Sequence, residues 1–277
     1  MIHKIFNVIN NPKRYVSRLK HTVSKRLKST ERLLCPVFQG TSFFLQSQMD
    51  INIYSLWYKP EFNKFSGGYY PKINQVRRQI CNLESWDNTR RDMLILLLRT
   101  IVERNVEGDI VELGVYKGFT AKLIHYYVPE RKLHLFDTFE GFTNRSVVSE
   151  KINTNKTISA ISFSDTTLDN VKKYIAPINN TVLYYKGYFP ESIPEEFRYK
   201  QFAFVHLDAD LYDPIMYGLK YFYPRIKCGG MILIHDYNAW LGTRKAVDEF
   251  FSDKKELPIP MPDKSGSALI IKQADLE

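Results

Sequence analysis

Acidic residues and a histidine gather in three short runs, each of which directly follows an apolar stretch. Asp137 follows KLHLF, Asp208 and Asp210 lie in LDADLYDP, and His235 and Asp236 lie in IHDYN. If each apolar stretch is a strand of a parallel sheet, these side chains sit at the carboxyl ends of strands, where open α/β sheets bind ligands. Carboxylates that converge there can hold a divalent cation or take up a proton during catalysis. The alternative, in which these acids only cap the helices that follow, stays open.

A fourth run, VELGVYKGFT, predicts a strand that turns tightly into a helix and carries Glu112, Gly114 and Gly118. The dinucleotide fingerprint requires a glycine two residues after the first one, where this chain has Tyr116, so NAD and FAD are disfavoured. A nucleoside ligand without a pyrophosphate, such as S-adenosylmethionine, tolerates this looser turn. Asp137 ends the next strand, where an acid can bind a ribose diol. An ordinary strand-to-helix turn without a ligand stays open for this run taken alone.

The alternation of apolar and amphipathic stretches after Gly108 predicts a parallel α/β sheet. The predicted strands span 109–114, 132–137, 181–185, 202–208, 230–235 and 267–272. The predicted helices span 118–127, 166–175, 213–224 and 242–252, and an earlier helix spans 87–105. The polar stretch 141–164 contains few apolar residues, so we expect a mobile loop that can cover the site.

The positive charge of the chain is concentrated at its start. Residues 1–34 carry nine Lys or Arg and one acid, and the remaining 30 basic and 29 acidic residues nearly balance. This balance argues against nucleic-acid binding by the main body. Apolar residues at helical spacing predict a basic amphipathic helix after Pro12, which can lie on an anionic membrane, bind a partner or pack on the domain. We therefore divide the chain into an extension (1–34), an aromatic-rich and helical cap region (35–107) and a main domain (108–277).

The cysteines and the hydropathy of the chain indicate in which cellular compartment the protein is expected. The three cysteines form no C-x-x-C pair and support neither a disulfide framework nor a zinc knuckle, so we expect a cytoplasmic protein. The longest apolar run, at 93–98, is far shorter than the ~20 residues that cross a bilayer. Peripheral contact with the inner face of the membrane through residues 1–34 and assembly into a homo-oligomer both stay open. No hydrolase elbow, zinc-protease helix or P-loop motif is present in the sequence.

Together these runs resemble the macrocin O-methyltransferase family of S-adenosylmethionine-dependent enzymes, which methylate sugar hydroxyls. The resemblance covers about 87–272 and rests on VELGVYKG, FDTFEGF, HLDADLYDPIMYGLKYFYPRIKCGG, and IHDYN with GTRKAVDEF. It implies a class I methyltransferase fold, with a mostly parallel, seven-stranded sheet and helices on both faces. It further implies that Glu112, Gly114 and Asp137 bind the cofactor and that Gly118 shapes the turn. The acceptor would be a sugar or a glycosylated small molecule.

The same resemblance implies a metal site, often magnesium, beside the acceptor. Asp208 and Asp236 match metal-binding acids, and Asp210 matches a candidate general base. The antibiotic-sugar members have two adjacent acids where this chain has His235 and Asp236, so an imidazole replaces one oxygen ligand. Magnesium prefers oxygen, whereas imidazole suits manganese and other transition ions better. His235 is therefore a candidate metal ligand and also a second candidate base.

Two other functions stay open. The chain can be an O-methyltransferase for a non-sugar, phenolic hydroxyl, or a non-catalytic module that binds an adenosine ligand. His206 lies within a predicted strand, so we expect a buried structural residue. Trp240, directly after IHDYN, is expected to form either a sugar-stacking lip or a packing contact.

Overall fold

The structure is a computed structural model, and it describes residues 87–274. In chain order the elements are α6 (Asn88–Glu103), β1 (Asp109–Leu113), α7 (Phe119–Tyr127), β2 (Leu133–Asp137), α8 (Asn144–Thr154), α9 (Leu168–Ile175), β3 (Val182–Lys186), β4 (Phe202–Leu207), α10 (Tyr212–Phe222), β5 (Ile226–Ile234), α11 (Leu241–Phe251), β6 (Ile259–Pro260) and β7 (Ala268–Ile271). The predicted basic helix after Pro12 and the aromatic-rich stretch up to residue 86 lie outside the described residues.

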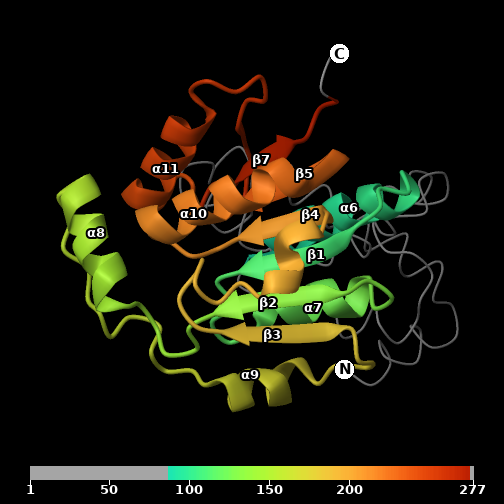
Figure 1. Cartoon of the computed structure of the whole chain (residues 1–277), viewed down its shortest axis with the longest axis horizontal. Coiled ribbons are helices and arrows are strands. Elements are labelled where there is room, and N and C mark those ends of the chain that lie inside the picture. Colours follow the sequence, from blue (N-terminus) through green and yellow to red (C-terminus); the bar gives the residue numbers. More distant parts are fainter. Residues whose placement is uncertain (1–86, 275–277) are drawn as a thin grey trace, which may run out of the picture. The chain divides into compact units, whose positions relative to one another are not determined.

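The strands form one seven-stranded sheet in the order β3-β2-β1-β4-β5-β7-β6 (Figure 1). β1 to β5 are parallel to one another, and β7 runs antiparallel to β5 and β6. In this register Leu113 of β1 pairs with Phe136 of β2 and with Leu207 of β4, and Leu207 pairs with Ile234 of β5. The carboxyl ends of the four central strands therefore meet at one edge, which confirms the predicted α/β sheet.

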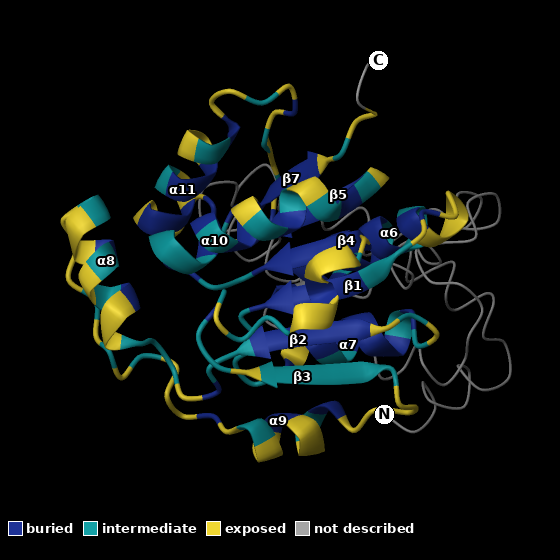
Figure 2. Cartoon of the chain, viewed as in Figure 1, coloured by how far each residue is buried: buried dark blue, intermediate teal, exposed yellow. Residues whose placement is uncertain are grey.

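Helices bury both faces of this sheet. Alternate side chains of β1 point to opposite sides, because Ile110 packs into a core shared with α6, α7 and α9, whereas Val111 packs into a core shared with α10 and α11. β4 is buried along its whole length, as is typical of a parallel strand that is covered on both faces. Figure 2 shows this burial across the central strands and the partial exposure of the edge strand β3.

The predicted helix at 87–105 is confirmed as α6, which begins after Asp87. The Asp87 carboxylate caps it by accepting from the backbone N–H of Arg90 at 3.0 Å. Leu94 and Leu98 of α6 are fully buried in the core that α6 shares with the sheet. This helix, which the sequence-based division places in the cap region, is thus part of the α/β core.

The stretch 141–164 differs from its predicted form. Its residues 144–154 form helix α8, so the expectation of a loop is wrong there. Thr143 caps the helix by accepting from the N–H of Ser146 at 3.1 Å, and α8 lies against α10 and α11. The buried residues of α8 are Ser146 and Glu150. Because both are polar, the helix carries no apolar stripe that a hydropathy pattern can reveal.

None of the helices within residues 87–274 has the length and apolar character required to span a bilayer.

Candidate functional site

A cavity of about 370 Å³ opens at the carboxyl edge of the sheet. Its lining includes Glu112, Gly114, Asp137, Asp208, Asp210, His235 and Asp236. The structure thus brings together residues from four separate strand ends, as the sequence predicts. Of the expected site residues, Gly118 lies outside the described lining and directly precedes α7 as its N-cap residue.

The turn after β1 depends on its glycines. Gly114 has φ +88°, and a Cβ there would come within 3.0 Å of the backbone of Asp208, closer than real Cβ atoms approach. Gly118 has φ +84° and packs against Ile175 of α9, so it shapes the turn away from the cavity. Tyr116, at the position where a dinucleotide fold carries glycine, adopts φ +49°. A tyrosine therefore takes a left-handed conformation that glycine usually supplies.

The carboxylate of Asp137 organises this turn. Its Oδ2 accepts from the N–H of Val115 at 2.6 Å and from the N–H of Tyr116 at 2.9 Å. Its Oδ1 accepts from the N–H of Phe139 at 2.6 Å. The hydroxyl of Thr138 also lies 3.4 Å from Oδ1, but its single proton has a closer acceptor in the carbonyl of Gly141 at 2.7 Å. A carboxylate offers about four acceptor positions, so the three backbone bonds leave about one for a ligand. Asp137 is thus an anchor of the loop as well as a lining residue.

Glu112 and His206 form a buried pair on neighbouring strands. The imidazole Nδ1 of His206 lies 3.0 Å from Oε1 of Glu112, and both side chains are buried. Burial lowers the pKa of His206 to about 3, so its imidazole is neutral at physiological pH. The expectation that His206 is a buried residue of a strand is confirmed.

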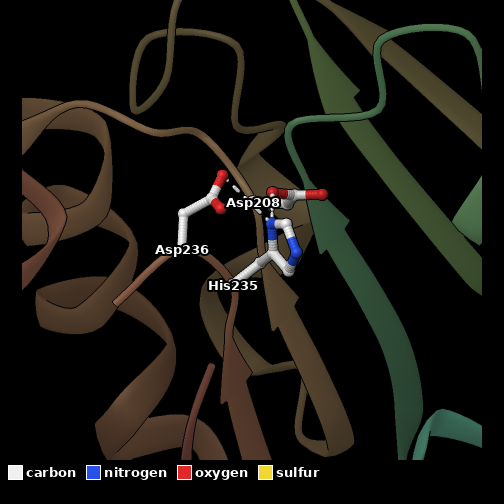
Figure 3. Close-up of side chains that lie close together, drawn as sticks. All are labelled: Asp208, His235 and Asp236. Atoms are coloured by element: carbon white, nitrogen blue, oxygen red, sulfur yellow. Dashed lines mark hydrogen bonds and ion pairs between the residues drawn. The ribbon is translucent and has the colours of Figure 1, made fainter. Parts of the chain in front are cut away.

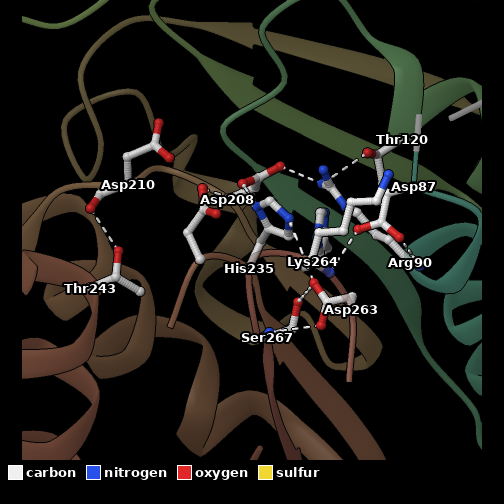
Figure 4. Close-up of polar contacts among 12 residues, drawn as sticks. Asp87, Arg90, Thr120, Asp208, Asp210, His235, Thr243, Asp263, Lys264 and Ser267 are labelled. Atoms are coloured by element: carbon white, nitrogen blue, oxygen red, sulfur yellow. Dashed lines mark hydrogen bonds and ion pairs between the residues drawn. The ribbon is translucent and has the colours of Figure 1, made fainter. Parts of the chain in front are cut away.

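Asp208 is held by two cationic groups (Figure 4). Its Oδ2 accepts from Nη2 of Arg90 at 2.6 Å, and its Oδ1 lies 2.9 Å from Nδ1 of His235. Arg90 also donates to the hydroxyl of Thr120 at 3.2 Å. Burial alone would raise the pKa of Asp208, but His235 and Arg90 outweigh that effect and hold it well below its usual range. Asp208 is therefore an ionised carboxylate.

His235 lies between two carboxylates. Its Nδ1 is 2.9 Å from Oδ1 of Asp208 and 3.1 Å from Oδ2 of Asp236. Burial alone would lower the pKa of His235, but the charge and hydrogen bond of Asp208 and the hydrogen bond of Asp236 raise it to about 10. The imidazole is then a cation at neutral pH, which differs from the expectation that His235 is a base.

Asp210 and Asp236 share a side-chain hydrogen bond. Burial, the charge of Asp208 and this hydrogen bond raise the pKa of Asp210 well above its usual range. Burial would also raise the pKa of Asp236, but the hydrogen bond and charge of His235 and the hydrogen bond with Asp210 lower it. Asp210 thus holds the shared proton and Asp236 is ionised, so the base expected at Asp210 is protonated here.

The spacing of three side chains fits a divalent ion (Figure 3). One ligand atom from each of Asp208, His235 and Asp236 lies within 4.8 Å of the others. Two of these residues are ionised carboxylates and the third offers an imidazole nitrogen, which are donor types that divalent ions accept. One nitrogen and two oxygens suit a transition ion better than magnesium. Such an ion would replace the proton on Nδ1 of His235.

Aromatic rings form a chain along the cavity. Tyr116 meets Phe163 at a centroid distance of 5.0 Å, Phe163 meets Phe142 at 5.1 Å, and Phe142 meets Trp240 at 6.1 Å. All three contacts are edge-to-face, a favoured geometry for aromatic pairs. Tyr116, Phe142 and Phe163 line the cavity. We call these four rings the aromatic rim.

Comparison with known proteins identifies the family. Residues 86–269 match the model of the macrocin-O-methyltransferase (TylF) family. The chain belongs to this family. Among curated members, it is 24% identical over 159 residues to demethyldecarbamoylnovobiocin O-methyltransferase of Streptomyces niveus, covering 54% of this chain and 60% of that protein. It is 27% identical over 157 residues to mycinamicin III 3''-O-methyltransferase of Micromonospora griseorubida, covering 52% and 61%.

Solved structures support the fold of this macrocin O-methyltransferase family member. The O-methyltransferase NovP superposes with a TM-score of 0.58 at 20% identity, covering 68% of this chain and 81% of NovP. The calicheamicin methyltransferase CalS11 gives 0.52 at 16% identity, covering 71% and 90%. The class I methyltransferase fold expected from the sequence is confirmed. The chain spans about three fifths of the length of the curated relatives named above.

Four lining residues of this family member have backbone strain. Tyr116, Phe163, Asp210 and Asp236 have φ values of +49°, +60°, +60° and +58°. Left-handed conformations are costly for residues other than glycine, and they cluster at functional sites. The surrounding hydrogen bonds and ring contacts must therefore hold these residues in place.

Arg90 is the site residue that sequence reasoning missed. It comes from α6, 118 positions before the aspartate that it binds. A signal was available, because Arg90 lies at helical spacing before Met93, Leu97 and Ile101, which places it on the apolar face of this helix. A buried guanidinium requires an acidic partner, and the strand-end acids are the nearest candidates in the sequence pattern.

Proposed function

We propose that this protein is an S-adenosylmethionine-dependent O-methyltransferase that modifies a hydroxyl of a sugar or of a glycosylated small molecule. The observation that carries the proposal is that one cavity is lined both by the turn after β1 and by the acids Asp208, Asp210 and Asp236. Membership of the macrocin O-methyltransferase family supports it, as do relatives named for novobiocin and mycinamicin methylation.

The cofactor would lie along the turn after β1. The cavity has a volume of about 370 Å³, which is within the range of small-molecule sites. Asp137 would accept from a ribose hydroxyl with its remaining lone pair, and Gly114 would let the chain pass close to the cofactor. Glu112 would offer a buried carboxylate to the ammonium group of the methionine part. The bound cofactor supplies a methyl group that is already activated by the sulfonium.

The protein must then align the acceptor oxygen and receive its proton. The bound cofactor would supply the methyl group and its sulfur would keep the electron pair of the broken carbon–sulfur bond, so the acceptor's proton is what the protein itself must take up. We assign proton uptake to the Asp210–Asp236 pair, because Asp236 is ionised and Asp210 already shares a proton with it. His235, held as a cation beside the pair, would stabilise negative charge that develops on the acceptor oxygen.

We also propose that Asp208, His235 and Asp236 hold a divalent ion when one is present, and manganese more readily than magnesium. Such an ion would lower the pKa of the acceptor hydroxyl. Because Arg90 binds Oδ2 of Asp208, the ion would contact Oδ1 and would replace the proton that lies between Oδ1 and His235.

The aromatic rim supports an acceptor with a flat apolar face. Aromatic rings stack on the CH face of a sugar and equally on a phenol ring. A phenolic acceptor is therefore the second candidate, favoured by the rings of Tyr116, Phe142 and Phe163 along the cavity.

A methyl-transfer screen tests the proposal. Cofactor with a tritiated methyl group is incubated with nucleotide sugars, glycosylated phenols and free phenols, each with manganese, with magnesium and with a chelator. We expect label in the sugar-bearing acceptors and stimulation by manganese. Label confined to the free phenols would support the second candidate. Binding of the cofactor in calorimetry without transfer to any acceptor would indicate a non-catalytic module, and binding of NAD in its place would refute the cofactor assignment.

A further inference from the structure

A buried glutamate on α8 lies between the N-termini of two other helices. Glu150 is 1% exposed, and its Oε2 accepts from the N–H of Tyr212, the first residue of α10, at 2.8 Å. Within residues 87–274, the residues that precede α10 and α11, Leu211 and Trp240, form no side-chain cap. Glu150 therefore supplies from a distant helix the acceptor that α10 lacks.

The same carboxylate reaches the first turn of α11. A Cβ built on Gly242, the second residue of α11, would collide with both carboxylate oxygens of Glu150, far inside 3.0 Å. The missing side chain at Gly242 thus leaves the space that Glu150 occupies. A negative charge beside a helix N-terminus is stabilised by the helix dipole. The carboxylate of Glu150 lies beside the N-termini of both α10 and α11.

These two helices follow the loops that carry the acid pair. Asp210 lies two residues before α10, and Asp236 lies five residues before α11. A further bond ties the loops together, because the hydroxyl of Thr243 in the first turn of α11 donates to the backbone carbonyl of Asp210 at 2.6 Å (Figure 4). Both aspartates have left-handed backbones, so their positions depend on such external restraints.

The helix that carries Glu150 also faces the cavity. Ser146 of α8 and Thr143, its cap, line the cavity, whereas Glu150 is not among the described lining residues. The carboxylate of Glu150 thus links a segment that lines the cavity to the loops that carry Asp210 and Asp236, without itself lining the cavity.

We propose that Glu150 is a positioning residue. Its carboxylate, inserted between the N-termini of α10 and α11, holds Asp210 and Asp236 in their shared hydrogen bond and docks α8 beside them. This role rests on the proposed methyl transfer for its catalytic consequence, but its structural part does not.

The isosteric variant Glu150→Gln tests this role in the full chain. It keeps an oxygen for the N–H of Tyr212 and removes the charge. We expect kcat for methyl transfer to fall at least tenfold, while KM for the acceptor and Kd for S-adenosylmethionine change less than twofold. Glu256→Gln is the matched control, because Glu256 is a buried glutamate that accepts from the backbone N–H of Gln273 at 3.1 Å, and both lie outside the described cavity lining. This control should keep the wild-type kcat.

A double-mutant cycle isolates the contact with Gly242. Gly242→Ala should lower kcat in the wild-type background, because the new methyl group displaces the carboxylate, and should add little loss in a Glu150→Ala background. Equal losses in the two backgrounds would overturn the contact. A wild-type kcat in Glu150→Gln, or a loss that Glu256→Gln reproduces, would overturn the positioning role.

Amide hydrogen exchange separates this inference from the proposed function. In Glu150→Gln, exchange should become faster at residues 209–213 and 236–243 and stay unchanged along β1 and β2. If the wild-type protein transfers no methyl group to any acceptor, the proposed function fails, yet the exchange experiment still decides the role of Glu150. Unchanged exchange in both segments would refute it.

Discussion

Replacing Asp137 by asparagine should weaken cofactor binding without unfolding the domain. The wild-type carboxylate accepts from three backbone N–H groups in the turns after β1 and β2. An asparagine at this position keeps one acceptor oxygen and turns an NH₂ group toward the remaining donors. If the oxygen stays with Val115 and Tyr116, the N–H of Phe139 loses its partner and the ribose loses its acceptor.

The expected magnitude follows from the bonds that are lost. A hydrogen bond to a charged group contributes about 1.5–3 kcal/mol. The loss of one such bond to the ribose corresponds to roughly a 10- to 100-fold increase in Kd, because about 1.4 kcal/mol is a factor of ten. The lost bond at Phe139 acts on the turn and should lower the melting temperature as well.

Calorimetry with S-adenosylmethionine measures this change directly. The matched control is Asp109→Asn, at the opposite end of β1, where Oδ2 of Asp109 lies 2.8 Å from Nε2 of His134. The control also loses a half-buried carboxylate, so it should lower stability while keeping the wild-type Kd. Wild-type affinity in Asp137→Asn, or an equal loss in both variants, would refute the assignment of Asp137 to the ribose.

Three further predictions address the metal, the pH dependence and the basic segment. His235→Asp should shift metal preference from manganese toward magnesium, measured by titration of each ion against the apo protein, and an unchanged order of affinity would contradict the donor-set reasoning. Burial lowers the pKa of His125, whose Nε2 accepts from the N–H of Ile178 at 3.0 Å, so the unfolded chain binds the proton more readily. The stability contributed by neutral His125 should be complete above pH 6.5 and should decline below it, by at most about 1.4 kcal/mol per pH unit. Denaturant unfolding at pH 7.5 and 5.5 measures this decline, which should be larger in the wild type than in His125→Gln. Deletion of residues 1–34 should leave cofactor affinity unchanged and reduce binding to anionic vesicles, and equal vesicle binding would remove the membrane interpretation.

The sequence predicted the sheet well because its strands are buried on both faces. In the strand Phe202–Leu207 every residue except His206 is apolar and all six are buried, and this pattern does not depend on which helices pack against the strand. The acids at the strand ends were predicted to converge for the same reason, since the carboxyl ends of neighbouring parallel strands must meet. The convergence of Asp137, Asp208 and Asp236 on one cavity followed from topology alone.

The missed features depend on contacts between distant polar residues. α8 packs through Ser146 and Glu150, so neither its helical form nor its docking is visible as hydrophobic periodicity. The protonation of Asp210 and His235 depends on neighbours brought in from other strand ends, and Arg90 comes from a helix far earlier in the chain. Local sequence patterns predict helices and strands, whereas the protonation of buried acids and the partners of buried ion pairs depend on which residues meet at the carboxyl edge of the folded sheet.

The left-handed residues of the cavity have a consequence for attempts to stabilise this protein. Glycine at Tyr116 would lose the ring contact with Phe163 and the hydrogen bond to Asp165, whereas at Asp210 it would remove a carboxyl group whose ionisation burial already disfavours. At Asp210 glycine would relieve about 1–2 kcal/mol of backbone cost, partly offset by about 0.4–1 kcal/mol from the greater freedom of the unfolded chain. A library ranked by melting temperature would therefore accept glycine at Asp210, although this substitution removes the carboxyl group from the cavity. Directed evolution for thermostability should keep Asp210 fixed, because it would otherwise select thermostable proteins that lack this group.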